Sequence, residues 1–222
     1  VTVSVLYWHR ANAVRQQAMA LPSITFVTGN KGKLTEVQAM LAGIATVDAV
    51  KVDLPELQGD PLEVAKEKAV TAFATLQRPC MVEDTSLCFH ALNDLPGPYI
   101  KWFLDKCGHE GLNKMLDGFE DRGAHAMCIF TVAESADKAD VKCYVGRCEG
   151  TIVRPRGPGG FGWDPVFCPK EGPEGKTFAE MSADEKNAIS HRKRALDALK
   201  TRFRAAAGDA NAAASEKKRE RE

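Results

Sequence analysis

The 222-residue sequence lacks a net charge, a paired cysteine pattern and any long apolar run. Thirty acidic side chains balance thirty basic ones, and the absence of a basic excess argues against a dedicated nucleic-acid-binding protein. The seven cysteines form no Cys-x-x-Cys pair, which favours neither a disulfide framework nor a zinc site. No stretch approaches the roughly 18 apolar residues of a membrane span, and no signal peptide is visible. We therefore expect a cytoplasmic protein with reduced thiols and no membrane or nucleic-acid partner.

Apolar residues make up 44% of the chain and charged residues 27%, which is typical of a globular fold. We expect one domain over residues 20–207. Residues 1–19 start without methionine and are predicted to be an N-terminal extension, either disordered or added by the expression vector. Residues 208–222 contain alanine as their only apolar residue beside dense mixed charge, which predicts a disordered tail.

The sequence Thr-Gly-Asn-Lys-Gly-Lys at residues 28–33 follows a short strand predicted over Ile24–Thr28. Leu34, Val37 and Leu41 then recur at helical spacing, so the segment predicts a strand, a turn and a helix. A helix N-terminus attracts anions through its free N–H groups and its dipole, and lysines add positive charge. The turn is therefore a candidate phosphate site, with an ordinary solvated turn as the alternative.

The rest of the chain predicts further helices and a hairpin. Asp60, followed by proline, has the signature of a helix N-cap. Residues 127–133 and 141–153 are predicted to pair as antiparallel strands. A Ser-x-x-Glu capping box at Ser182 opens a helix predicted to run to about Phe203. The expected fold class is α/β with a mixed β-sheet flanked by helices.

Two acidic residues, Glu83 and Asp84, directly follow an apolar run over residues 79–82. The run predicts a buried strand that ends there, and polar residues at a strand end indicate a site. If the backbone is extended, the two side chains point to opposite sides. Together with Glu56 they offer the oxygen ligands that Mg²⁺ takes. Solvated acidic side chains are the alternative.

Two aromatic residues, Phe161 and Trp163, flank Gly162 beside Asp164. Aromatic faces stack on nucleobases, and a carboxylate accepts hydrogen bonds from a base. Core packing is the alternative for both rings.

Arg192 falls inside the apolar stripe of the helix predicted from Ser182, with His191 on the flank of that stripe. A guanidinium on a buried face needs a partner, because desolvating an unpaired charge is costly. Arg192 therefore either pairs with an acidic residue elsewhere or meets a ligand in a cleft. For His191 a plain surface position is the alternative to a site.

Taken together, these segments resemble the inosine triphosphate pyrophosphatase family, and more closely its eukaryotic members. The resemblance covers about Ile24 to Phe203. Five ordered motifs carry it: Phe26-Val27-Thr28-Gly29-Asn30 with Lys33, Val82-Glu83-Asp84-Thr85-Ser86-Leu87, Leu95-Pro96-Gly97-Pro98-Tyr99-Ile100-Lys101-Trp102-Phe103, Phe161-Gly162-Trp163-Asp164-Pro165 and Glu185-Lys186-Asn187-Ala188-Ile189-Ser190-His191-Arg192.

The resemblance implies an elongated mixed sheet in two lobes around a central nucleotide-binding cleft, and a homodimer. It also implies hydrolysis of ITP, dITP or XTP to the monophosphate and pyrophosphate, with Mg²⁺ or Mn²⁺. Glu56 and Asp84 would ligate the metal, and Glu83 or Asp84 would act on water. The residues that would hold substrate are Thr28, Gly29, Asn30, Lys31, Gly32, Lys33, Lys68, Asp84, Thr85, Lys101, Phe161, Gly162, Trp163, Asp164, Lys186, His191 and Arg192. Gly32 departs from the bulkier residue common in relatives, which is expected to loosen the phosphate loop.

Three rival functions are weighed against hydrolysis. The first is a nucleotide-binding regulatory protein without turnover, against which the carboxylates Glu56, Glu83 and Asp84 argue. The second is a P-loop kinase, whose Gly-x-x-x-x-Gly-Lys-Ser/Thr motif is absent. The third is a nucleic-acid-binding module, which needs a basic face.

Overall fold

A computed structural model of the chain describes residues 21–158 and 161–202. The extension predicted over residues 1–19, the tail predicted over residues 208–222 and the predicted helix end at Phe203 lie outside the described residues. No helix of the described part is long and apolar enough to cross a membrane.

A seven-stranded mixed sheet forms the centre of the fold, with the strand order β2-β1-β3-β5-β6-β7 and β4 paired to β3. β1 runs parallel to β2 and β3, and the other pairings are antiparallel. The predicted α/β class with a mixed sheet is therefore confirmed. The strands are β1 Ser23–Val27, β2 Thr46–Val50, β3 Cys80–Phe89, β4 Pro96–Gly97, β5 Gly123–Ala133, β6 Lys142–Ile152 and β7 Phe167–Pro169.

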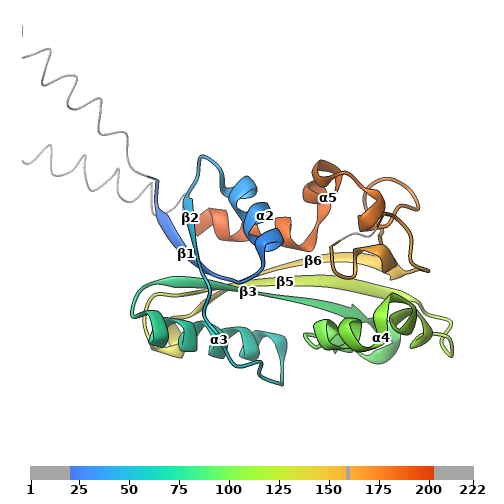
Figure 1. Cartoon of the computed structure of the whole chain (residues 1–222), viewed down its shortest axis with the longest axis horizontal. Coiled ribbons are helices and arrows are strands. Elements are labelled where there is room, and N and C mark those ends of the chain that lie inside the picture. The colour runs from blue at the N-terminus through green and yellow to red at the C-terminus, as the bar shows by residue number, and fades with distance from the viewer. Residues whose placement is uncertain (1–20, 159–160, 203–222) are drawn as a thin grey trace, which may run out of the picture.

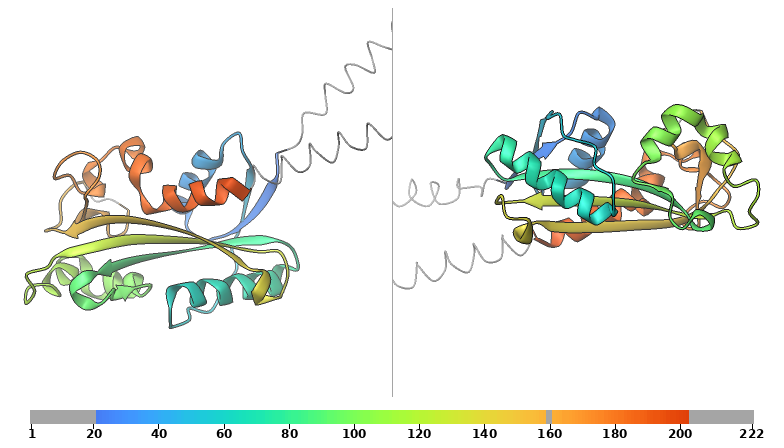
Figure 2. Two further views of the ribbon diagram at one scale, coloured as in Figure 1. Left: turned by 180° about the vertical axis from the view of Figure 1, so that it is seen from behind. Right: turned by 90° about the horizontal axis from the view of Figure 1, so that it is seen from below.

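Helices cover both faces of this sheet. α2 (Lys31–Leu41), α5 (Ala183–Ile189) and the helix at residues 191–202 lie on one face, and α3 (Pro61–Leu76) and α4 (Ile100–Lys114) lie on the other (Figure 1). The long strands β3, β5 and β6 run from one end of the molecule to the other, with α2 and α3 at one end and α4 and α5 at the other (Figure 2). This gives the elongated, two-lobed shape that the sequence resemblance implies.

Local sequence signals account for where the first two helices begin. The Asn30 side chain accepts a hydrogen bond from the Lys33 N–H and caps α2. The Asp60 side chain caps α3 and is followed by Pro61 at the first helical position, where proline costs no hydrogen bond. The apolar faces of both helices are then buried against the sheet.

Separate apolar clusters hold the two ends together. At the β1 end, α2 and residues 195–199 pack on one sheet face, and α3 packs on the other. At the far end, α4 packs with Trp163, Phe167 and Phe178. Because each lobe has its own core, the polar middle of the long strands is left between the lobes.

The predicted strand over residues 79–82 does not end at Glu83, and this prediction is wrong. β3 continues to Phe89, and every residue from Cys80 to Phe89 is paired with β5. A continuous backbone ladder can pass through polar residues when their side chains find partners beside the sheet.

The predicted single helix from Ser182 to Phe203 is also wrong, because the chain breaks at Ser190 (ψ 155°) between α5 and the helix at residues 191–202. The second helix lies directly on Gly146 of β6, where a Cβ atom would come within 2.2 Å of the His191 carbonyl oxygen and of the Ala195 nitrogen. Because of the break, the apolar stripe predicted for one continuous helix does not match the observed burial. Before the break, the charged Lys186 is buried, whereas the apolar Ala188 is exposed.

Candidate functional site

A cleft of about 620 Å³ opens where the central strands separate. In the described part of the chain, the ladder between β1 and β3 is limited to Phe26 and Met81, and β4 joins β3 only from Leu87 onward. The β3 edge between these points faces the cleft. Side chains from both faces of β3 therefore reach one cavity.

Most of the site residues expected from sequence line this cleft, and Lys31 and Gly32 do not. Those that do are Thr28, Gly29, Asn30, Lys33, Glu56, Lys68, Glu83, Asp84, Thr85, Lys101, Phe161, Gly162, Trp163, Asp164, Lys186, His191 and Arg192. Gly32 lies just behind the lining, where a Cβ atom would be 3.1 Å from the Phe161 ring. The missing side chain therefore gives the Phe161 ring room against the first turn of α2.

The turn between β1 and α2 brings a helix N-terminus to the cleft. The Asn30 N–H donates to Thr28 Oγ1 (3.1 Å), and Asn30 Oδ1 accepts from the Lys33 N–H (3.0 Å). These bonds hold the turn in a defined shape and leave the Lys33 side chain beside the cleft. The helix dipole and the lysine both favour an anion here.

Glu83 and Asp84 lie on opposite sides of the extended β3 strand, as their adjacency requires. Glu83 faces α2 and the helix at residues 191–202: its Oε2 is 2.7 Å from Lys33 Nζ, and its Oε1 is 2.9 Å from Arg192 Nη2. Asp84 faces α3, where its Oδ1 accepts from Lys68 Nζ at 2.5 Å. One strand thus supplies carboxylates to two different surroundings.

The Glu83 side chain is fully buried, and its Oε2 makes the ionic contact with Lys33 but no hydrogen bond among the described residues. Thr85 Oγ1 donates to its Oε1 (2.7 Å), and so does the Cys128 thiol (3.3 Å). Burial alone would raise the pKa of Glu83, but Arg192 and Lys33 outweigh burial and hold this pKa well below its usual range. Glu83 is therefore ionised and a poor proton acceptor in the free chain, which suits an anchor for its cationic neighbours.

Asp84 has a different environment. Its Oδ2 is buried and has no hydrogen-bond partner among the described residues. Burial lowers the pKa of Lys68, but Asp84, Glu56 and Glu83 raise it by more. Glu56 is exposed, with its Oε1 3.3 Å from Lys101 Nζ. This side of the cleft holds a carboxylate oxygen still able to accept a ligand.

The two carboxylates expected to hold a metal, Glu56 and Asp84, belong to no group of three close metal-type ligands within the described residues. Mg²⁺ commonly takes one or two protein carboxylates and completes its shell with water and substrate phosphates. The unpartnered Asp84 Oδ2 fits that ion as a single strong protein ligand.

A chain of alternating charges crosses the other side of the cleft. Arg192 Nη1 is 2.5 Å from Glu36 Oε2, and Glu36 Oε1 is 3.7 Å from Lys186 Nζ. Lys186 Nζ in turn donates to Asp164 Oδ2 at 2.6 Å. Counted with Lys33 and Glu83, three cations face three carboxylates. The expected ion pair of Arg192 is therefore present, on a residue that also lines the cleft.

The aromatic pair is split between two environments. Trp163 is 7% exposed and packs against Phe167 and Phe178, whereas Phe161 is 42% exposed. Trp163 thus matches core packing while still bordering the cleft, and Phe161 presents an exposed ring with Lys186 Nζ 5.6 Å from its centroid. His109 Nε2 lies 2.8 Å from the Gly162 carbonyl oxygen and links α4 to this loop.

His191 is buried, and the alternative of a surface histidine is wrong. Its ring lies near Trp163 and Phe178, with centroid distances of 5.3 and 6.1 Å. Burial, reinforced by Arg192 and Lys186, holds the pKa of His191 well below its usual value, so the ring is neutral. Neither ring nitrogen has a hydrogen-bond partner in the described part of the structure. A neutral ring with free nitrogens at a cleft can bind a polar ligand edge.

Two cleft-related residues, Glu36 and Lys51, were missed by sequence reasoning. Lys51 follows β2, and its side chain packs about 3.5 Å from where a Gly29 Cβ would be. Lys51 could have been found from sequence, because the carboxyl ends of neighbouring parallel strands such as β1 and β2 meet at one edge of the sheet. Glu36 carries no such signal, since its partner Arg192 is 156 positions away.

The fold and the cleft together define an α/β protein whose site combines a helix N-terminus, lysines, a free carboxylate oxygen and a buried polar pocket beside an exposed ring. That set of groups suits a ligand with a polyanionic end and a planar, polar end. The family profile that matches residues 24–202 is that of the Ham1 family. The chain belongs to this family.

Curated relatives and solved structures agree with that assignment. "Inosine triphosphate pyrophosphatase 2" of Trypanosoma cruzi (strain CL Brener) is 54% identical over 182 residues, covering 81% of this chain and 91% of the relative. "Inosine triphosphate pyrophosphatase" of Emericella nidulans is 52% identical over 176 residues, covering 79% and 93%. The structure of a HAM1 protein from Coxiella burnetii is 30% identical with a TM-score of 0.72, covering 82% of this chain and 98% of that one.

Proposed function

We propose that this protein is a nucleoside triphosphate pyrophosphatase. It hydrolyses the non-standard purine nucleotides ITP, dITP and XTP to the monophosphate and pyrophosphate, and so removes them from the nucleotide pool. The observation that carries the proposal is the unpartnered Asp84 Oδ2, buried beside Lys68 in a cleft rich in lysine. The names of the curated relatives support the same substrate class.

The phosphates lie on the turn before α2 in this proposal. Within Thr28 to Lys33, the N–H groups that make no bond inside the fold and the lysine side chains attract the phosphates, and Lys68 and Lys101 neutralise charge from the opposite wall. Hydrolysis at the α-phosphorus requires such charge on the transferring and leaving oxygens, with water held in line. The domain that does this spans residues 20–207, and the family match at residues 24–202 falls inside these bounds.

Asp84 is assigned the metal together with Glu56, and Asp84 also orients the attacking water. A bound Mg²⁺, or Mn²⁺, supplies Lewis-acid stabilisation of the phosphate oxygens. Glu83 was the other candidate for acting on water. Its oxygens are engaged by Lys33, Arg192 and Thr85, so we assign it the positioning of Lys33 and Arg192.

The purine lies at the other end of the cleft, with Phe161 stacked on its face. Lys186 and Arg192 are donors without acceptors, and Arg192 Nε has no hydrogen-bond partner among the described residues. Hypoxanthine presents the O6 acceptor to such donors, whereas adenine presents an amino group. The donors of Lys186 and Arg192 would stay unpaired beside adenine, which disfavours binding of ATP. Asp164 and His191 hold the remaining polar edge of the purine.

Product analysis with the purified full-length chain tests this function. With Mg²⁺, we expect rapid release of pyrophosphate from ITP and slow release from ATP. Asp84→Asn should lower turnover at least about 100-fold, the scale for losing one preorganised charged group, with unchanged circular dichroism. Asp48→Asn, a matched change at an exposed position of β2, should keep full activity.

Two results would contradict the proposal. Orthophosphate as the direct product would indicate another hydrolase class. Binding of ITP without turnover would indicate the regulatory alternative, a nucleotide-binding protein without chemistry. Near-normal activity of Asp84→Asn would remove Asp84 from its assigned role and leave the overall function standing.

We extend the proposal to a homodimer and to a cytoplasmic location. The family resemblance supports the dimer, and sedimentation velocity tests it. Seven free cysteines are consistent with a reducing compartment, and microscopy of the tagged protein tests the location.

A further inference from the structure

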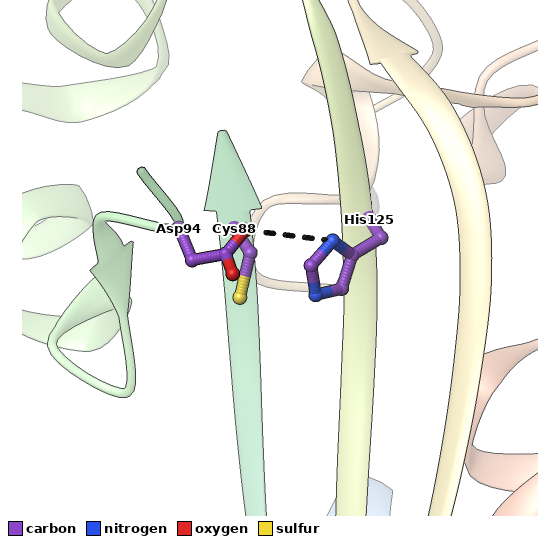
Figure 3. A group of neighbouring side chains, drawn as sticks. All are labelled: Cys88, Asp94 and His125. Atoms are coloured by element: carbon purple, nitrogen blue, oxygen red, sulfur yellow. Dashed lines mark ion pairs between the residues drawn. The ribbon is translucent and has the colours of Figure 1, made fainter. Parts of the chain in front are cut away.

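A second group of ligand-type side chains lies outside the cleft, around the far end of β3. Cys88 on β3 and His125 on β5 are directly paired across the strands. Asp94 comes from the turn between β3 and β4 and approaches the same point (Figure 3). Three ligand types from three segments therefore meet at one place.

The geometry of this group is close to that of a metal site. One ligand atom from each residue lies within 4.8 Å of the others, and Asp94 Oδ1 is 3.8 Å from His125 Nδ1. Tetrahedral zinc, with bonds of about 2.0–2.3 Å, brings its ligands to about 3.3–3.7 Å from one another. Small side-chain rotations close that gap, because Asp94 lies on an exposed turn.

An independent observation concerns His125 itself. Its side chain is 8% exposed, and it makes no hydrogen bond to another residue in the described ranges, since Asp94 is beyond hydrogen-bond reach. It borders a second cavity, of about 380 Å³, that Cys88, Asp94 and Tyr99 also line. A buried imidazole that makes no hydrogen bond and faces a cavity with a thiol and a carboxylate is suited to a metal site.

The chemistry of the ligands decides the class of ion. Thiolate and imidazole ligands select zinc and similar transition metals, whereas Mg²⁺ prefers oxygen. We propose that Cys88, Asp94 and His125 bind a single Zn²⁺-class cation, with water as the fourth ligand. This site is separate from the Mg²⁺ site proposed in the nucleotide cleft, where the ligands are carboxylates.

A neighbouring set, His90, His125 and Glu149, shares one histidine with this site. His90 and Glu149 are more open, with side chains 34% and 48% exposed, and their closest atoms are 3.6 Å apart. The His125 Nδ1 atom is directed at Asp94 (Figure 3). The buried pair of Cys88 and His125 therefore favours the first set.

The location gives the ion a structural role. Asp94 begins the segment that continues through Pro98, Ile100 and Lys101, and these three residues line the nucleotide cleft. Pro98 lines both cavities. A cation held by Cys88, Asp94 and His125 ties this cleft wall to the paired strands β3 and β5.

Metal binding by the full-length chain tests the proposal. After removal of metals with a chelator, the wild type dialysed against Zn²⁺ should retain one ion per chain and show a higher melting temperature. Co²⁺ in its place should give the near-ultraviolet charge-transfer band of a thiolate ligand. Cys88→Ser should lose that band and weaken Zn²⁺ binding at least roughly 10-fold, the scale found even for outer-shell changes.

Controls separate this site from binding elsewhere and from misfolding. Cys80→Ser removes a thiol from the same strand with the same 2% exposure and should leave binding unchanged. Asp94→Asn changes an exposed residue whose φ of 70° asparagine tolerates, so it should fold normally and bind Zn²⁺ more weakly.

Three results would overturn the proposal. The first is a wild-type chain that retains no Zn²⁺. The second is equal binding by the wild type, Cys88→Ser and Asp94→Asn. The third is loss of binding in His90→Gln with normal binding in Cys88→Ser, which would place the ion in the neighbouring set.

Discussion

Replacement of Arg192 by methionine should lower the free energy of unfolding far more than the same replacement of Arg194. Arg192 has a side chain 2% exposed and bridges Glu36 and Glu83. Arg194 lies on the same helix with a side chain 38% exposed, paired to the exposed Glu171. Arg194→Met is therefore a matched control that removes one surface ion pair.

The structure sets the size of the difference. Breaking a buried pair by removing one partner costs about 3–5 kcal/mol. Lys33 Nζ, which lies 2.7 Å from the Glu83 carboxylate, is not removed by the change, so we expect the lower end, about 3 kcal/mol. Arg194→Met should cost about 0–1 kcal/mol, the range for exposed pairs.

The cost of Arg192→Met should depend on pH. In the wild type the pKa of Glu83 lies well below its unfolded value of 4.5, so this carboxylate stabilises the fold above about pH 4.5 and loses that effect as pH falls. Without Arg192 the pKa of buried Glu83 rises toward or above 4.5, and this contribution shrinks or is lost. The difference between the two proteins should therefore be largest at neutral pH and decrease steadily as the pH falls below about 4.5.

Urea unfolding at pH 7 and pH 4 measures these free energies. Adding Glu83→Gln to form a double-mutant cycle isolates the pair, and the double variant should cost less than the sum of the single ones. Equal costs for Arg192→Met and Arg194→Met, or a cost of Arg192→Met that does not fall with pH, would refute the reasoning.

Two further predictions concern packing and substrate binding. Gly146→Ala should lower the free energy of unfolding by about 1–3 kcal/mol or more, because the new methyl group meets backbone atoms of the helix at residues 191–202. Gly118→Ala, which has open space around it, should change this free energy by less than about 0.5 kcal/mol. Equal effects of the two changes would exclude the steric explanation. Phe161→Ala should raise the KM for ITP about 5- to 150-fold, the equivalent of about 1–3 kcal/mol of stacking. Phe161→Tyr keeps the aromatic ring and should leave the KM unchanged. An unchanged KM in Phe161→Ala would exclude a stacking role for Phe161.

Much of the fold was predictable because its signals are local. The Asn30 turn, the Asp60 cap and the Ser182 capping box each act within three residues, and the structure contains all three. The strand end predicted at Glu83 was wrong for the opposite reason. Whether a polar residue continues a strand depends on its partner strand and on ions across the sheet, here β5, Lys33 and Arg192.

The site was predictable to the extent that its groups lie in short motifs. Seventeen of the expected residues line the cleft, because the turn before α2 and the polar segment of β3 carry them as units. Lys51 was missed although strand order could have found it. The surface alternative left open for His191 is wrong, because a helix break at Ser190 precedes it and its ring packs 5.3 Å from that of Trp163.

The sequence by itself determined the balanced charge, the unpaired cysteines, the helix starts and the order of the motifs, since each depends on composition or on neighbours a few positions apart. Only the tertiary structure decided which charges neutralise one another and which ligands meet. Glu36 finds Arg192 across 156 positions, and Cys88 meets His125 through strand register. Register and helix packing are set by burial over the whole sheet, so the absence of a Cys-x-x-Cys pattern excluded a zinc motif and left open a site assembled in space.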